Sequence, residues 1–341
     1  MRSNSIPAAH PRPTRERIVR LALRLAVRTA DLIDGVPTAR LDPLYLALRH
    51  LETFRRWPNM RHPATFNEHI LAYKLSNPGN ELMSRLADKI AVKEYVANRI
   101  GPQYLIPTLW YGNAAEGIPF ADLACAPHVI KSAFGSSQNI FIRQPDDFDK
   151  NEVVRTVNEW MHEAYGRRMR EYQYARIPRR ILVEPLVLVD GHVPEDYKFY
   201  AFNGTVRLVQ VDTDRFGRHT RTLFDVDWRA QDFAYVYPRP ALDPARPAQL
   251  DRMIEVAQSL TPGVEFVRVD LYDLRTRIAF GELTFTPEGG DGKFYPDGAD
   301  LEVGRYWACA RSREEATDQS PVHPSTHSEP VPPRSKPGAN R

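Results

Sequence analysis

The amino-acid sequence predicts an α+β protein, with helices in the N-terminal third of the chain and antiparallel hairpins after them. Thr65 and Glu68 form a capping-box motif, which marks the start of a helix. Asn203-Gly204 stands between two segments that alternate apolar and polar residues, which predicts a β-hairpin. A second alternating pair, at 264–285, predicts another hairpin. Helical segments followed by runs of strands are typical of the α+β class.

Length and composition exclude several classes of protein. The 341 residues suit one large multi-lobed domain or two ordinary ones, and the net charge of +3 is too small to indicate nucleic-acid binding. Cys125 and Cys309 form neither a disulfide framework nor a zinc site, which favours a reducing cytoplasm. No apolar run approaches the ~18 residues of a membrane span. The sequence therefore predicts a cytoplasmic protein without a nucleic-acid partner.

The two ends of the chain differ from the middle in composition. Residues 1–13 are rich in proline and arginine, and residues 309–341 are polar, so both are predicted to be disordered. A helix is predicted at 14–33, with arginines on one face and apolar residues on the other. Such a basic amphipathic helix either packs on the rest of the protein or lies on an anionic membrane surface. The pattern alone leaves both interpretations open.

Between these ends, apolar spacing and end signals predict a series of regular elements. The predicted helices are Asp42–Trp57, Phe66–Leu75, 82–101, Phe148–Tyr174 and Leu250–Leu260. The predicted short strands outside the two hairpins are Leu105–Leu109, Pro127–Ile130, Ile140–Arg143 and Ile181–Val183.

The loop between two of these strands has the composition of a phosphate-binding clamp. Lys131 ends one strand, and the small residues Gly135, Ser136 and Ser137 follow before the next strand. Small residues let backbone N–H groups approach phosphates, and a lysine adds a point charge. The glycine spacings of a P-loop and of a dinucleotide-binding fingerprint are absent. A plain hairpin is the alternative for this loop taken alone.

The hairpin at 264–285 carries a pair of carboxylates. If its turn is centred near Thr276, Asp270 lies opposite Glu282 and Arg268 lies opposite Thr284. Opposed side chains have Cβ atoms ~4.5–5.5 Å apart, so two carboxylates there repel and need a cation between them or a retained proton. A hard cation with oxygen ligands, above all Mg²⁺, suits such a pair. An exposed hairpin with solvated charges is the alternative.

Several strings resemble the TupA-like amidoligases of the ATP-grasp superfamily, which are named for teichuronopeptide biosynthesis. They occur in family order over about residues 61–307, which is stronger than any single match, and include TFNE, DYKFYAFNG, DVDW, FVRVDLY and FGELTFTP. The resemblance implies an ATP-grasp fold, in which two α/β lobes sandwich ATP, with a helical N-terminal segment. The division it implies is 14–60 for N-terminal helices, 61–126 for a substrate-side part, 127–190 for the lid lobe and 191–308 for the catalytic and metal lobe.

The resemblance also implies ATP and Mg²⁺ as cofactors and a role for each site residue. The implied cofactor-binding residues are Lys89, Lys131, Gly135, Ser136, Ser137, Glu184 at the adenine edge and Asp196 at the ribose. The implied metal ligands are Asp270, Glu282 and Thr284, and the implied catalytic residues are Arg268, Arg215 and Lys198. Ser137 stands where the family usually has glycine, and Thr284 where the superfamily usually has asparagine.

The implied reaction is ATP-dependent ligation of a carboxylate and an amine through an acyl phosphate. The family name points to a small-molecule or polymer carboxylate in the synthesis of a surface polysaccharide, at the inner face of the membrane. Two other classes stay open from the sequence. One is an ATP-binding protein without turnover, and the other is a glycosyltransferase-type enzyme of the same pathways. The sequence carries no signal for an oligomeric state.

Overall fold

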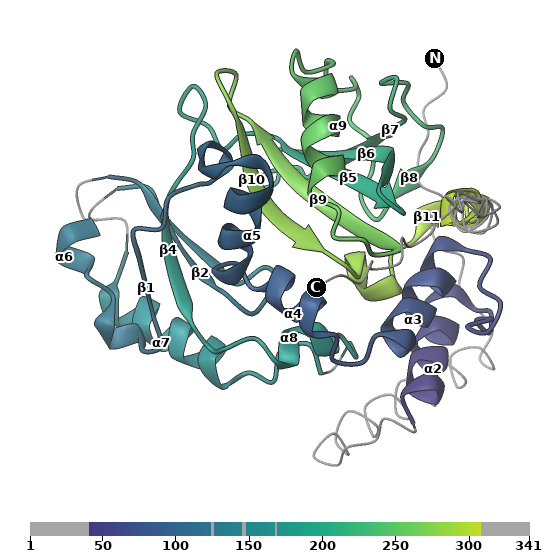
Figure 1. The fold of residues 1–341 in the computed structure, drawn as a ribbon, viewed down its shortest axis with the longest axis horizontal. Coiled ribbons are helices and arrows are strands. Elements are labelled where there is room, and N and C mark those ends of the chain that lie inside the picture. Colours follow the sequence, from purple (N-terminus) through teal and green to yellow (C-terminus); the bar gives the residue numbers. More distant parts are fainter. Residues whose placement is uncertain (1–40, 124–125, 145–147, 168, 308–341) are drawn as a thin grey trace, which may run out of the picture.

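The computed structural model describes residues 41–123, 126–144, 148–167 and 169–307. Two antiparallel sheets stand side by side, with helices around and between them (Figure 1). This arrangement confirms the predicted α+β class. The ends that are predicted to be disordered and the amphipathic helix at 14–33 lie outside the described residues. No helix within these four ranges is long and apolar enough to span a membrane.

The smaller sheet has the strand order β1-β4-β2-β3. Its strands are β1 (Trp110–Gly112), β2 (His128–Ser132), β3 (Asn139–Ile142) and β4 (Ile181–Pro185). Helices α6 (Phe120–Leu123) and α7 (Lys150–His162) accompany it. Val153 and Val157 of α7 are buried in one cluster with residues of β2, β3 and β4, so this helix covers one face of the sheet. The sheet therefore has its own apolar core.

The larger sheet has the strand order β10-β9-β5-β6-β7. Its strands are β5 (Asp196–Phe202), β6 (Thr205–Thr213), β7 (Thr220–Phe224), β9 (Phe266–Asp273) and β10 (Ile278–Thr284). Helix α9 (Leu250–Ser259) packs on one face, and a short pair formed by β8 (Ala234–Tyr235) and β11 (Phe294–Tyr295) lies beyond β7. Asn203 and Gly204 have φ of 43° and 77°, the positive values that the predicted hairpin turn requires.

The N-terminal helices are α2 (Asp42–Phe54), α3 (Phe66–Ser76), α4 (Glu81–Ala87) and α5 (Ala91–Ile100). The capping box at the start of α3 is confirmed, because the side chain of Thr65 accepts from the N–H of Glu68 and the Glu68 side chain accepts from Thr65. Glu68 also accepts from the N–H groups of Asn59 and Ala64, which fixes the chain that enters the helix.

Three predicted elements are wrong. The helix at 82–101 breaks at Asp88, whose side chain accepts from the N–H of Ile90 and so starts a second helix. The helix at Phe148–Tyr174 ends at His162, and only a short helix, α8 (Tyr172–Ala175), follows. Leu105–Leu109 is no strand because Pro107 lacks an N–H, and pairing with β4 starts where Leu109 donates to Val183.

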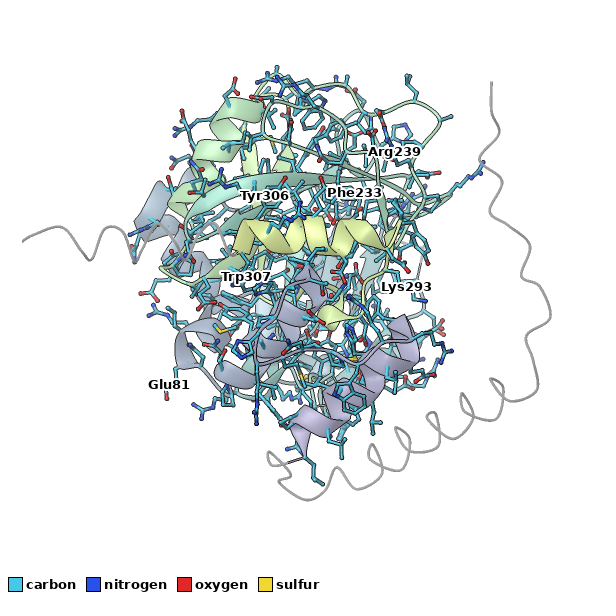
Figure 2. All side chains as sticks on the ribbon, turned by 90° about the vertical axis from the view of Figure 1, so that its right-hand side faces the viewer. Glu81, Phe233, Arg239, Lys293, Tyr306 and Trp307 are labelled. Carbon is cyan, nitrogen blue, oxygen red and sulfur yellow. The ribbon has the colours of Figure 1, made fainter. Side chains whose placement is uncertain are left out.

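A C-terminal helix at 298–307 holds α3 against the larger sheet. Figure 2 shows this helix with Tyr306 and Trp307 at one end of it. The indole of Trp307 stacks on Phe266 of β9 at 4.9 Å and on His69 of α3 at 5.0 Å. At the other end, Asp300 accepts from the backbone N–H of Asn67. The helix therefore joins the N-terminal helices to the strands that carry the candidate site.

Candidate active site

The hairpin of β9 and β10 has the predicted register at the carboxylate pair, whereas the pairs nearer the turn differ from it by one residue. Asp270 pairs with Glu282, and Arg268 pairs with Thr284. The cation expected between the two carboxylates is the guanidinium of Arg268, which donates to both oxygens of Asp270 at 2.7 Å and lies 3.3 Å from Glu282. Arg268 also donates to the Thr284 hydroxyl at 3.0 Å. The repulsion inferred from the sequence is thus compensated within the protein itself.

A β-bulge at Gly281 produces this register. Phe280 pairs with Leu271, and the next pair along the ladder is already Glu282 with Asp270. Without the bulge, Asp270 would pair with Gly281, and Glu282 would not lie opposite Asp270. A Cβ on Gly281 would lie 3.1 Å from the carbonyl oxygen of Asp270, so the bulge suits glycine.

The neighbouring strand β5 adds a second cation beside the carboxylate pair. Lys198 donates to Asp270 at 2.8 Å and also to Asp196 on its own strand. Arg215 donates to the same Asp196 oxygen at 2.5 Å. Asp196 and Lys198 are buried, whereas the side chain of Arg215 is 41% exposed. Sequence reasoning identified all three residues without their mutual contacts.

Opposite Asp196, β6 and β7 carry an ion pair that sequence reasoning missed. Asp212 pairs with Asp196 in the strand register and accepts from Arg221 at 2.6 and 3.1 Å. Arg221 also donates to Glu288 at 3.2 Å, and its guanidinium lies 4.9 Å from the ring of Tyr237. A bulge between Tyr200 and Ala201 shifts the register of this hairpin and places Asp212 beside Asp196, so the Asn-Gly turn alone did not predict the pair.

The smaller sheet contributes a carboxylate between two lysines. Glu184 on β4 accepts from Lys131 of β2 at 2.8 Å and from Lys93 of α5 at 2.5 Å. Burial raises the pKa of Glu184, but the two ammonium groups outweigh burial and hold this pKa below its usual value. Sequence reasoning did not identify Lys93 as a site residue. The available signal was its position four residues after Lys89, because residues four apart lie on the same face of a helix.

Lys89 links the two sheets. Its ammonium donates to the carbonyl of Gly135 in the loop after β2 and lies 3.8 Å from Glu282 on β10. Burial lowers the pKa of Lys89, and the charge of Glu282 opposes this shift. In the same loop Ser137 has a φ of 62°, in the left-handed region that favours glycine. The family's usual glycine at this position therefore fits the conformation that the loop adopts.

These groups line one cavity of about 450 Å³ between the two sheets. All of the site residues predicted from the sequence line this cavity except Gly135, whose carbonyl is instead bound by Lys89. Apolar residues of β2, β10 and the segment after β4 line it as well, among them Val129, Phe280 and Leu186. The cavity therefore has a charged part and an apolar wall, as a nucleotide requires.

Acid is expected to destabilise the protein through Asp212. Burial raises the pKa of this carboxyl group, but Arg221 outweighs burial and lowers it from 3.8 to about 2. A group whose pKa is lowered by folding stabilises the fold above its unfolded pKa, and this contribution is lost as the pH falls through the folded value. The thermal midpoint should fall between about pH 4 and about pH 2, and less steeply in Asp212→Asn. Equal slopes would contradict the assignment.

The carboxylate pair fits a magnesium site in its chemistry. Asp270 and Glu282 supply hard oxygen donors, and Oε2 of Glu282 lies 3.8 Å from the ammonium of Lys89. Burial raises the pKa of Glu282, but Lys89 and Arg268 hold it at about 2, so the group is ionised. The described residues contain no cluster of three His, Cys, Asp or Glu side chains that could hold a metal. Two carboxylates completed by substrate phosphates are typical of Mg²⁺.

A family model for TupA-like ATP-grasp proteins matches residues 69–308, which is most of the chain. No curated protein matches the chain. The D-alanine–D-alanine ligase from Bacillus anthracis is 15% identical, with 70% of this chain and 71% of that chain covered and a TM-score of 0.42.

The same Bacillus anthracis ligase complexed with ATP is 12% identical, with 70% of each chain covered and a TM-score of 0.40. The ATP-grasp ligase PsnB, complexed with a phosphomimetic variant of its minimal precursor, Mg and ADP, is 10% identical and has a TM-score of 0.36. That comparison covers 64% of this chain and 57% of that chain.

The family model carries the assignment, since it spans both sheets and every predicted site residue. It leaves no place for the glycosyltransferase-type alternative, which requires a different fold. The chain belongs to the TupA-like ATP-grasp family, and it is an ATP-dependent ligase with ATP and Mg²⁺ as its cofactors.

Proposed function

We propose that the protein joins a substrate carboxylate to an amine through an acyl phosphate. The observation that carries the proposal is that Lys131 of the smaller sheet and Lys89, which precedes α5, line one cavity with the carboxylate pair of the larger sheet. The cavity is lined by seven lysines and arginines and by seven carboxylates, within the described residues. Because these charges balance, a bound triphosphate needs the extra positive charge of a metal ion.

The proposed nucleotide site places phosphates between the two sheets. Lys131 and Lys89 would hold them from one side, and Arg268 and Lys198 from the side of the carboxylate pair. Glu184 keeps Lys131 oriented, with the backbone around Leu186 as the candidate adenine edge. Mg²⁺ held by Asp270 and Glu282, with Thr284 beside them, would neutralise charge on the phosphates. Positioning and electrostatics of this kind carry most of the catalysis in phosphoryl transfer.

The chemistry proposed for this site has two steps. A carboxylate oxygen of the substrate attacks the terminal phosphorus, the bond to ADP breaks, and an acyl phosphate results. The amine nitrogen then attacks the acyl carbon, and phosphate leaves with the electron pair of the broken C–O bond. Arg215 is the cation proposed to follow the moving charge, because its side chain is 41% exposed and its one ion pair within the described residues is with Asp196.

The family assignment supports two narrower proposals. The carboxylate belongs to a uronic acid of a surface polymer or its precursor, and the enzyme works in the cytoplasm at the inner face of the membrane. The segment at 14–33, outside the described residues, is the proposed point of peripheral membrane contact.

Trapping with hydroxylamine tests the proposed chemistry without knowledge of the amine. Hydroxylamine converts acyl phosphates to coloured hydroxamates, so a panel of uronic and amino acids with ATP and Mg²⁺ should give colour with the right acid. ADP should form in the same amount. Glu282→Gln should lose the colour, because the variant removes one of the two proposed metal ligands. ADP formed with a productive acid but without hydroxamate would overturn the proposal, and ATP binding without turnover would favour a non-catalytic protein.

A further inference from the structure

Within the described residues, one carboxylate of the cavity has no lysine or arginine nitrogen within 4 Å. The carboxylates that line the cavity are Glu171, Glu184, Asp196, Asp212, Asp270, Glu282 and Glu288. In the described part of the chain, all of them except Glu171 lie within 4 Å of a lysine or arginine nitrogen. Glu171 is only 9% exposed. A buried charge normally has a partner, so this residue requires an explanation.

The immediate surroundings of Glu171 are polar, and the residues that the structure describes form no salt bridge with it. Thr286, just past β10, donates its hydroxyl proton to Glu171 and accepts from Gln173 at 2.9 Å. Among the charged groups, Lys74 of α3 has the largest effect on the pKa of Glu171, which it lowers. Its ammonium nevertheless donates to two backbone carbonyls, those of Met169 and Gly289.

Two further charges face this carboxylate from α2 and from the segment after β10. These are Arg49 and Asp291, which form an ion pair with each other at 2.6 Å. Their opposite charges largely cancel at Glu171. The site therefore has one hydroxyl donor, one carboxylate and an open side toward the cavity.

Glu171 lies at the same end of the cavity as the carboxylate pair. Its hydrogen-bond donor Thr286 follows two residues after Thr284, whose hydroxyl accepts a hydrogen bond from Arg268 beside the carboxylate pair. Glu171 and the carboxylate pair line the cavity. Glu184, Val129 and Leu186 line the cavity from the side of the smaller sheet, which is the proposed nucleotide end. Glu171 is thus placed where the second substrate of a ligation must approach.

We propose that Glu171 binds the ammonium group of the amine substrate and takes one proton from it before attack on the acyl carbon. This inference rests on the proposed ligase function. The ammonium nitrogen gives one proton to the Glu171 carboxylate, and its freed electron pair forms the C–N bond. The C–O bond to phosphate breaks, and the second nitrogen proton leaves with the phosphate or to water. Glu171 then returns its proton to water.

The chemistry of the site favours an ammonium over a divalent metal. One carboxylate and one hydroxyl donor make a small, singly charged site, whereas Mg²⁺ takes six oxygen ligands and retains several waters. The hydroxyl of Thr286 already uses its proton on Glu171, which leaves the second carboxylate oxygen for the ligand. Burial raises the pKa of Glu171 against the effect of Lys74, and a raised pKa suits a carboxylate that must accept a proton near neutral pH.

Two nucleophiles separate this role from the first step of the reaction. Hydroxylamine is uncharged near neutral pH and has no proton to give before attack, whereas amino acids carry an ammonium group. The full chain is assayed with ATP, Mg²⁺ and an acid that gives hydroxamate, and the amines are the common amino acids in L and D forms. Glu171→Gln should keep hydroxamate formation within about twofold. Amide formation with the productive amine should fall by about 10²–10³-fold, the usual contribution of a general base.

Three controls separate the loss of the Glu171 carboxylate from a general loss of folding or of nucleotide binding. Glu68→Gln replaces another buried glutamate, outside the cavity, and should leave the ratio of amide to hydroxamate unchanged. Glu171→Asp should recover part of the amide activity, with an altered pH profile, because it restores the carboxylate. The rise of the thermal midpoint with ATP and Mg²⁺ should be the same in wild type and Glu171→Gln, which shows that the variant is folded and binds nucleotide.

The outcomes are distinguishable. If Glu171→Gln lowers hydroxamate and amide formation equally, or lowers neither, Glu171 does not act on the amine and the inference is wrong. It is also wrong if no amine of the panel forms an amide or suppresses hydroxamate formation in the wild type. If the wild type gives no hydroxamate with any acid, the ligase proposal fails first, and the inference fails with it.

Discussion

Asp270→Asn is expected to abolish ligation and to lower the free energy of unfolding by about 3–5 kcal/mol, the usual cost of removing one partner of a buried ion pair. Asp270 accepts two bonds of 2.7 Å from Arg268 and one of 2.8 Å from Lys198, and it is 2% exposed. The variant leaves both cations buried with one charge less between them. If the two carboxylates faced each other alone, removing one would relieve repulsion and stabilise the fold. The guanidinium between them makes the expected change in stability a loss instead.

Urea unfolding and phosphate release measure the two effects separately. Glu282→Gln is the matched variant, since it removes the other carboxylate of the pair. The side chain of Glu282 is 32% exposed and its nearest cations are 3.3 and 3.8 Å away, so its loss should change stability less than the loss of Asp270. Both variants should lose more than 10²-fold in turnover, the scale of a lost electrostatic contact to a transferring group. Unchanged stability in Asp270→Asn would refute the ion-pair account.

Gly304→Ala is expected to destabilise the fold by about 3 kcal/mol or more, because backbone blocks the added methyl group. A Cβ at this position would lie 2.2 Å from the carbonyl oxygen of Ala64, 2.8 Å from the carbonyl carbon of Thr65 and 2.9 Å from the nitrogen of Phe66. The C-terminal helix would have to move away from the start of α3. Thermal and urea unfolding of the two proteins measure the loss.

Gly298→Ala is the matched control for this effect. It lies in the first turn of the same helix, and no atom stands within 4 Å of a Cβ built there. Alanine should therefore leave stability unchanged or raise it by up to about 1 kcal/mol, the helix preference of alanine over glycine. Equal losses in both variants would mean that helix propensity, and not the close approach to α3, determines the effect.

The local elements of the fold were predictable because their signals are local. The two hairpins followed from period-two alternation with a short turn near Thr276 and with the Asn203-Gly204 turn. The turns set the register only as far as a bulge in each hairpin, and the bulge between Tyr200 and Ala201 was not predicted. The bulge at Gly281 was not predicted, but it shifts the register by one residue and so brings Asp270 opposite Glu282. The glycine inside the strand was the only sign of it.

Other parts depend on contacts between distant segments and have no local signal. Asp88 breaks a continuous helical pattern, and its carboxylate is then held by Arg180 at 2.5 Å across 92 residues. Glu171 lies in a stretch that resembles a charged helix, and only the packing of Lys74 and Thr286 around it brings it into the cavity. Residues that line the cavity in this way are recognised from the assembled structure and not from spacing.

Transfer of oxygen from the substrate carboxylate to phosphate tests the central claim most directly. The acid that gives hydroxamate is prepared with ¹⁸O in its carboxylate and incubated with ATP, Mg²⁺ and the productive amine. The attacking oxygen stays on phosphorus when the acyl phosphate is broken at its acyl carbon, so each released phosphate should carry one ¹⁸O. Phosphate without label, formed together with labelled amide in equal amount, would show that the carboxylate never bonds to phosphorus and would contradict the account.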